Sequence, residues 1–143
     1  MGYDPKKALL VGVILPNGED IDHEESLLEL KELACNLDYD VKESILVKLR
    51  KPQARFLTGP GKAEELIAMA KSHECGSILF DEPLLPSQQR NWEKVSELNV
   101  IDRQEVILDI FADRAQTKEA VLQVELARLQ YELPRMKRLW THL

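Results

Sequence analysis

The sequence has few of the residues that mark a membrane protein, a secreted protein or a metal centre. Aromatic residues make up 6% of the 143 residues, no apolar stretch approaches the roughly 18 residues of a membrane-spanning helix, and the N-terminus has no signal-peptide features. The two cysteines, Cys35 and Cys75, show no pairing pattern, which favours reduced thiols. The three histidines, His23, His73 and His142, do not have the spacing of metal ligands. We therefore expect a cytoplasmic protein with no membrane span, disulfide or metal site.

The motifs of nucleotide-binding domains are also missing. A P-loop requires Gly-x-x-x-x-Gly-Lys followed by Ser or Thr, because the hydroxyl holds the magnesium ion. Here Gly61-Lys62 is followed by alanine, and Phe56 stands where the first glycine belongs. The dinucleotide fingerprint GxGxxG fails as well, since Glu64 takes the place of the glycine that should follow Gly59 and Gly61. We expect no cofactor in this chain and no enzyme working from it alone.

Positive charge is scarce overall but concentrated locally. The net charge of −6 argues against a free-standing nucleic-acid binder, because phosphate contacts need clustered cations. Residues 1–40 carry a net charge of −7, whereas residues 41–62 carry +5 and residues 134–143 carry +3. The sequence therefore allows RNA contacts only in the two basic regions.

Strand-like and helical patterns alternate along the first hundred residues. Apolar or alternating runs predict strands, and apolar residues three and four apart predict helices. The predicted strands are 7–15, 41–49, 55–58, 77–80 and 99–102, and the predicted helices are 24–37, 62–72 and 87–98, the first capped by Asp22. Such alternation is typical of crossover connections in a parallel sheet. We predict an α/β fold: about four mostly parallel strands with helices on both faces.

A helical region follows the sheet pattern. Helices are predicted at 104–112 and 117–133, and in the second one Leu122, Leu126, Leu129 and Leu133 follow a 4-3-4 spacing that places them on one face. This leucine seam either packs on the sheet or forms one half of a helical hairpin, and the end of the chain ten residues later favours a hairpin cut short. We therefore divide the chain into a sheet subdomain, residues 1–102, and a helical subdomain, residues 103–143, truncated before the second helix of the arm.

Two basic stretches are candidate nucleic-acid contacts. The first lies between Ser44 and Ala63, contains no acidic residue, and comprises Lys48, Arg50, Lys51, Arg55 and Lys62. A solvated run of charge is its default interpretation. The second comprises Arg135, Lys137 and Arg138 with Trp140. The indole either stacks on an RNA base or packs on the preceding helix, and both interpretations stay open.

Two further motifs have a structural and a functional interpretation. The Gly59-Pro60-Gly61-Lys62 turn is best explained as a tight strand-to-helix connection with a solvated lysine, and its alternative is a site for one RNA phosphate. Asp81 and Glu82 follow a predicted strand, where open α/β sheets bind ligands. Since no histidine or third acid is near in sequence, we expect them to solvate the loop rather than hold a metal or act as a base.

Taken in order, several stretches resemble the N-terminal domain of the HflX family of GTPases. They are residues 56–62 (FLTGPGK), 80–82 (FDE), 85–91 (LPSQQRN), 100–103 (VIDR), 107–112 (ILDIFA), 122–127 (LQVELA), 131–135 (YELPR) and 140–143 (WTHL). The resemblance implies a parallel-sheet domain, a two-helix arm and then a domain with a P-loop that hydrolyses GTP with Mg²⁺. It implies that this chain stops before the second arm helix and the GTPase domain.

The resemblance also implies a partner. Proteins of the family bind the large ribosomal subunit, with the N-terminal region near the peptidyl-transferase centre, in the splitting or rescue of stalled ribosomes. The tip of the arm approaches ribosomal RNA most closely, so Arg135, Lys137, Arg138 and Trp140 are the nearest carried-over contacts. Gly59 and Gly61 match the glycine turn of the family.

Two other functions stay open. One is a stand-alone nucleotide-binding α/β domain that uses the Gly59–Lys62 turn and the Asp81-Glu82 pair. The other is a self-association module in which leucine seams of two copies pair.

Overall fold

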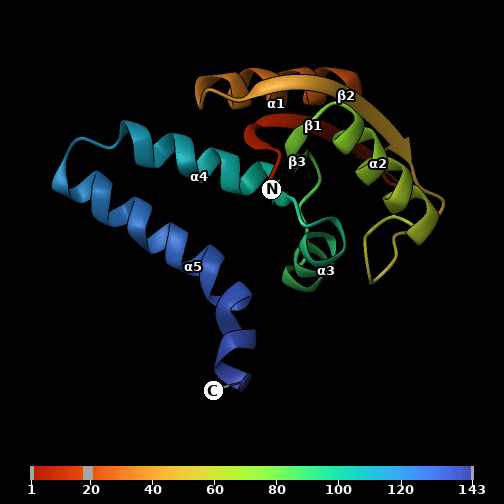
Figure 1. Cartoon of the computed structure of the whole chain (residues 1–143). Coiled ribbons are helices and arrows are strands. Elements are labelled where there is room, and N and C mark those ends of the chain that lie inside the picture. Colours follow the sequence, from red (N-terminus) through yellow and green to blue (C-terminus); the bar gives the residue numbers. More distant parts are fainter. Residues whose placement is uncertain (1, 18–20, 143) are drawn as a thin grey trace.

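The computed structural model describes residues 2–17 and 21–142, with side chains described as far as Met136. The elements are, in order, β1 (Asp4–Ile14), α1 (His23–Asn36), β2 (Asp40–Lys48), α2 (Pro60–Ser72), β3 (Cys75–Phe80), α3 (Pro86–Ser96), β4 (Asn99–Asp102), α4 (Arg103–Arg114) and α5 (Lys118–His142). The strands form one parallel sheet in the order β2-β1-β3-β4. α4 and α5 extend from its side (Figure 1). The predicted class, the parallel sheet and the helical arm, which is α5, are confirmed.

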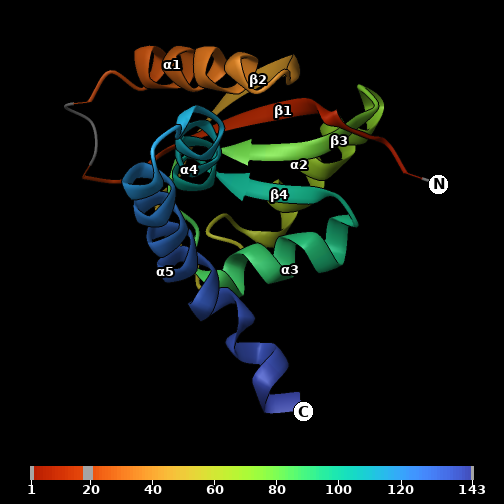
Figure 2. The same ribbon diagram turned by 90° about the vertical axis from the view of Figure 1, so that its left-hand side faces the viewer.

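The central strand β1 shows why the apolar run at residues 7–15 is continuous. Leu9, Val11 and Val13 pack with α2 and α3 on one face, and Ala8 and Leu10 pack with α1 and α4 on the other. All five are at most 3% exposed. A strand covered on both faces has no solvent side, so it lacks polar alternation. The helices on the two faces are visible in Figure 2.

The first helix begins where its sequence predicts. An Asp22 side-chain oxygen accepts a hydrogen bond from the backbone N–H of Glu25 at 3.0 Å, which satisfies one of the open donors at a helix start. Leu27, Leu30 and Ala34 are its buried residues. None of the helices in the described part of the chain combines the length and apolar character needed to cross a bilayer.

The strand predicted at 55–58 is wrong. The segment forms isolated antiparallel bridges, Gln53 with Leu57 and Phe56 with Thr58, outside the sheet. Leu57 has a φ of 68°, a left-handed conformation that interrupts an extended strand. The tight turn brings the segment back on itself instead of along a neighbouring strand.

The arm helix extends further than predicted, through Pro134 to His142. Proline removes one backbone N–H from the helical ladder. Beside it, the Arg135 guanidinium donates to the carbonyl of Tyr131 at 2.9 Å. That contact adds a side-chain hydrogen bond in the turn that proline weakens.

The helical region shares its core with the sheet. Val106 and Ile110 of α4 belong to the same apolar cluster as Leu10 of β1 and Leu30 of α1. The proposed division at residue 102 therefore separates the sheet and helices α1, α2 and α3 from α4 and α5, but it does not separate two cores.

Candidate nucleic-acid interface and the anchor of the arm

The basic segment, residues 48–62, runs from the end of β2 to the first turn of α2. Lys48, Arg50, Lys51 and Arg55 are exposed. Among the described residues no carboxylate forms an ion pair with Arg50, Lys51 or Arg55, whereas Lys62 Nζ lies 3.1 Å from Glu65. The structure thus places in one short loop three cations that have no carboxylate partner in the part of the chain that it describes.

The glycine turn is the start of α2. Gly59 is the N-cap, with φ −69° and ψ 159°, and Pro60 occupies the first turn of the helix. Neither glycine has a positive φ, and a Cβ added at Gly61 would meet nothing within 4 Å. The fold itself therefore does not require glycine at position 61.

Asp81 has a different role from the one predicted. Its carboxylate accepts hydrogen bonds from Arg103 Nε at 2.7 Å and from the Ser26 hydroxyl at 2.6 Å, and its side chain is only 10% exposed. Arg103 also donates to the carbonyl of Ser26 at 2.7 Å. Asp81 therefore joins α1 to the start of α4 and does not solvate the loop, because its oxygens are bound within the protein.

Glu82 lies beside this cluster. Burial, together with the neighbouring Asp81 charge, raises the pKa of its carboxyl group. Within the described residues no group of three or more His, Cys, Asp or Glu side chains is placed to hold a metal ion.

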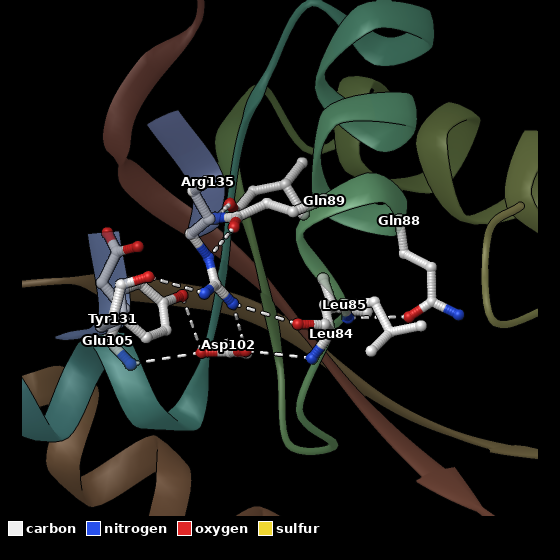
Figure 3. A network of polar contacts seen from close by, with 9 residues as sticks. Leu84, Leu85, Gln88, Gln89, Asp102, Glu105, Tyr131 and Arg135 are labelled. Carbon is white, nitrogen blue, oxygen red and sulfur yellow. Dashed lines mark hydrogen bonds and ion pairs between the residues drawn. The ribbon is translucent and has the colours of Figure 1, made fainter. Parts of the chain in front are cut away.

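A buried polar network joins the arm to the sheet (Figure 3). We call Gln89, Asp102, Tyr131 and Arg135 the arm anchor. Asp102 is 1% exposed and accepts hydrogen bonds from the Tyr131 hydroxyl at 3.1 Å and from the backbone N–H of Leu84 at 3.0 Å. It also caps α4 through a 3.2 Å hydrogen bond from the Glu105 N–H. One carboxylate therefore fixes a loop and two helices.

Arg135 completes the arm anchor from α5. Its guanidinium donates to Gln89 Oε1 at 2.6 Å and to the carbonyl of Leu84 at 3.0 Å, and it lies 3.7 Å from Asp102. It also stacks on the Tyr131 ring, 3.6 Å from the ring centroid. A side chain with this many internal partners is held within the fold, so the contacts favour a positioning role for Arg135 over direct RNA contact.

Ionisation in this region is shifted by burial. Burial raises the pKa of Glu105 to about 7, and the charges of Asp109 and Asp102 act in the same direction. Burial and the Asp102 charge likewise raise the pKa of Tyr131 above its ordinary value. Near neutral pH, Glu105 therefore exchanges between its neutral and charged forms.

The remaining predicted contacts of the arm, the side chains of Lys137, Arg138 and Trp140, lie outside the described residues. For the arm anchor, one signal is available from the sequence, namely an aspartate, Asp102, between a predicted strand and a predicted helix. Gln89 and Tyr131 had no such signal, because their partners are 11 to 46 residues away in the chain.

The leucine seam faces away from the anchored side of the arm. Leu122, Leu126, Leu129 and Leu133 are 51–62% exposed. The contacts of α5 with α4 include the 2.8 Å ion pair between Arg128 and Asp109. An open groove of about 420 Å³ separates part of the two helices, lined by residues such as Phe111 and Val124.

Comparison with known proteins identifies the family. Residues 24–112 match the family model described as "GTP-binding GTPase N-terminal", and residues 114–143 match "GTP-binding GTPase Middle Region". The chain is 49% identical over 138 residues to "GTPase HflX" of Akkermansia muciniphila, covering 96% of this chain and 32% of that protein. It is 39% identical over 142 residues to "GTPase HflX" of Escherichia coli, covering 99% of this chain and 33% of that protein. The chain thus spans about a third of the length of these curated relatives.

Solved structures agree with this relationship. A crystal structure of a GTP-binding protein from the archaeon Sulfolobus solfataricus in complex with GDP matches with a TM-score of 0.66 at 27% identity, covering 94% of this chain and 40% of that one. The crystal structure of the SsGBP and GDP complex matches with a TM-score of 0.69 at 26% identity, covering 92% of this chain and 37% of that one. The chain belongs to the HflX family of GTPases and corresponds to its N-terminal domain.

Proposed function

We propose that this chain is the ribosome-binding module of an HflX GTPase that acts on stalled ribosomes in the cytoplasm. Its partner is the large ribosomal subunit, which it contacts through ribosomal RNA. In the longer protein, the GTPase domain binds GTP with Mg²⁺ and hydrolyses it, and the present chain supplies the contact with the ribosome.

The observation that carries this proposal is the exposed positive charge of the basic segment. Arg50, Lys51 and Arg55 project from one loop without carboxylate partners among the described residues. RNA affinity depends strongly on such clustered cations, because each phosphate contact releases counterions. The acidic residues are concentrated instead in residues 1–40, so we expect the RNA to approach the loop and not α1.

Binding to purified large ribosomal subunits tests the proposal. The chain is co-sedimented with subunits over a series of salt concentrations, alongside a variant with Arg50→Glu, Lys51→Glu and Arg55→Glu. We expect the wild-type chain to bind with a strong salt dependence and the variant to lose most of its affinity, since three attractive contacts become repulsive.

A control with the same change in net charge separates local from global electrostatics. Lys31, Lys94 and Lys118 are exposed and lie outside the basic segment, so the variant with all three changed to Glu should bind nearly as well as the wild type. Equal loss in both triple variants would show that net charge, and not the loop, governs binding. Absence of any wild-type binding would contradict the proposal.

One observation favours a second function, self-association. The leucine seam is more than half exposed, and such a stripe on a helix packs well against another helix. Light scattering over a concentration series would detect a dimer that Leu126→Asp abolishes. A monomer at all concentrations would leave the seam to another partner. No contact in the described residues favours the nucleotide-binding alternative at Gly59–Lys62.

A further inference from the structure

Three side chains of α3 hold the carbonyl groups of the basic segment. Gln88 Nε2 donates to the carbonyl of Gln53 at 3.0 Å. Asn91 Nδ2 donates to that of Arg55 at 2.9 Å, and Trp92 Nε1 donates to that of Phe56 at 2.8 Å. The helix and this loop lie side by side in both views (Figures 1 and 2). Side chains thus satisfy carbonyls that an ordinary surface loop leaves to water.

The loop is also closed on itself. Gln53 and Leu57 exchange two backbone hydrogen bonds, of 2.9 and 3.0 Å, and Leu57 is held at a φ of 68° while only 6% exposed. A bulky residue adopts that conformation at a cost, so surrounding contacts must stabilise it. The closed turn and the α3 donors together supply those contacts.

The donors of α3 are themselves fixed. Gln88 is 4% exposed, and its Oε1 accepts from the backbone N–H of Leu85 at 2.9 Å, which orients the amide. Trp92 is fully buried and packs edge-on against Phe56 and Phe80, with ring centroids 5.8 and 5.0 Å away. Phe56 in turn lies under the Arg55 guanidinium, 5.0 Å from the ring centroid. Packing in the core of the sheet domain therefore helps to position the exposed Arg55 guanidinium.

We infer that Gln88, Asn91 and Trp92 are positioning residues of the RNA-binding site: they hold the loop in its binding shape before RNA arrives. The inference rests on the proposed function. None of the three needs to touch RNA. By fixing the backbone that carries Arg50, Lys51 and Arg55, they lower the conformational entropy lost on binding, which raises affinity without adding a contact.

This role has a signature that separates it from direct contact. The slope of log affinity against log salt concentration counts phosphate contacts, with about 0.7 to 0.9 per phosphate. Loss of a cation lowers the slope. Loss of a positioning residue weakens binding at every salt concentration and leaves the slope unchanged, because the same cations meet the same phosphates after the loop is ordered.

The test measures this slope for three variants with purified large ribosomal subunits. Asn91→Leu removes one donor and keeps the number and branching of the side-chain heavy atoms at a partly exposed position, so the fold should tolerate it. Arg50→Ala removes a cation. Ser87→Ala is the matched control, an exposed α3 residue outside the hydrogen bonds described above. Amide hydrogen exchange at Leu57 in the free chain reports whether the loop is held.

We expect Asn91→Leu to bind about 3- to 10-fold more weakly, the range of one net hydrogen bond, with an unchanged slope and faster exchange at Leu57. Ser87→Ala should match the wild type, and Arg50→Ala should lower the slope by about one phosphate. Wild-type affinity in Asn91→Leu, or a lower slope in that variant, would overturn the positioning role while the proposed function stands. No binding by the wild-type chain would overturn the proposed function, and this inference with it.

Discussion

The sheet and the arm use their apolar residues in opposite ways. In β1, Leu9 and Leu10 are fully buried between two layers of helices. In α5, Leu126 is 58% exposed, although its helix is longer than any other in the chain. The sheet is therefore held by its core, whereas much of the apolar surface of the arm contributes nothing to attaching it.

Polar contacts attach the arm instead. Tyr131 donates a hydrogen bond to Asp102, and Arg135 donates one to Gln89. Arg128 forms an ion pair with Asp109. Hydrogen bonds and ion pairs are directional, so they fix an angle between elements better than apolar contact does. The orientation of the arm is therefore set by contacts on one face of α5, and the leucine seam stays available for another surface.

The largest effect should come from the core of the sheet subdomain. Leu30→Ala removes a fully buried side chain of α1 that packs on the sheet. We expect the free energy of unfolding to fall by about 2 to 5 kcal/mol, measured by urea denaturation. A change below 1 kcal/mol would show that this face of the sheet is loosely packed.

The next largest effect should come from the arm anchor. Removing one partner of a buried ion pair costs about 3 to 5 kcal/mol. Because the Arg135 side chain is 18% exposed, we expect about 2 to 3 kcal/mol for Arg135→Ala. Amide exchange should accelerate along α5 and stay slow in β1. Equal acceleration in both would mean that the sheet and the arm unfold as one unit, contrary to a separate polar attachment of the arm.

Glu105 should give the anchor a pH dependence. Its pKa is about 7 in the folded chain against 4.5 ordinarily, so the folded state binds the proton more tightly. Stability contributed by this group is then greatest below about pH 4.5 and decreases as the pH rises to about 7. We expect about 1 to 2 kcal/mol, reduced by solvent screening.

Glu105→Gln is the check on this dependence. The variant should be more stable than the wild type at pH 8. The two should converge at about pH 3.5, where Glu105 is neutral in both the folded and the unfolded state, since an amide resembles the neutral acid. Parallel stability profiles for the two proteins would contradict the shifted pKa.

The smallest effect should come from the leucine seam. Leu126→Ala should change the free energy of unfolding by no more than about 0.5 kcal/mol, as for other surface substitutions. Together with Leu30→Ala, this variant shows how much the same leucine-to-alanine substitution changes the free energy of unfolding in the sheet core and in the arm. A loss above 2 kcal/mol, measured at a concentration where the chain is monomeric, would show that the seam already packs within the chain.

The sequence predicts the sheet well because its signals are local. The apolar run of β1 and the periodicity of α1 depend on neighbouring residues, and Asp22 caps a helix that begins beside it. The prediction fails at residues 55–58, where an apolar run suggests a strand but donors from α3, some 35 residues away, shape the segment into a turn.

The candidate site is predictable only in part, for the same reason. The cations of the basic segment are visible in the composition of one stretch. The roles of Asp81 and Arg135 are not visible in the sequence, because each has hydrogen-bond partners that lie 22 to 55 residues away in the chain. The sequence alone does not distinguish a charged residue that faces solvent from one that is bound in a buried polar network.

A photo-crosslink from the basic segment tests the central claim, contact with ribosomal RNA, most directly. The photoreactive amino acid p-benzoylphenylalanine replaces Lys51 in one sample and Glu29, an exposed residue of α1, in another, and each chain is irradiated with large ribosomal subunits. We predict RNA adducts from position 51 and few or none from position 29. Adducts from both positions in equal yield, or from neither, would contradict the account.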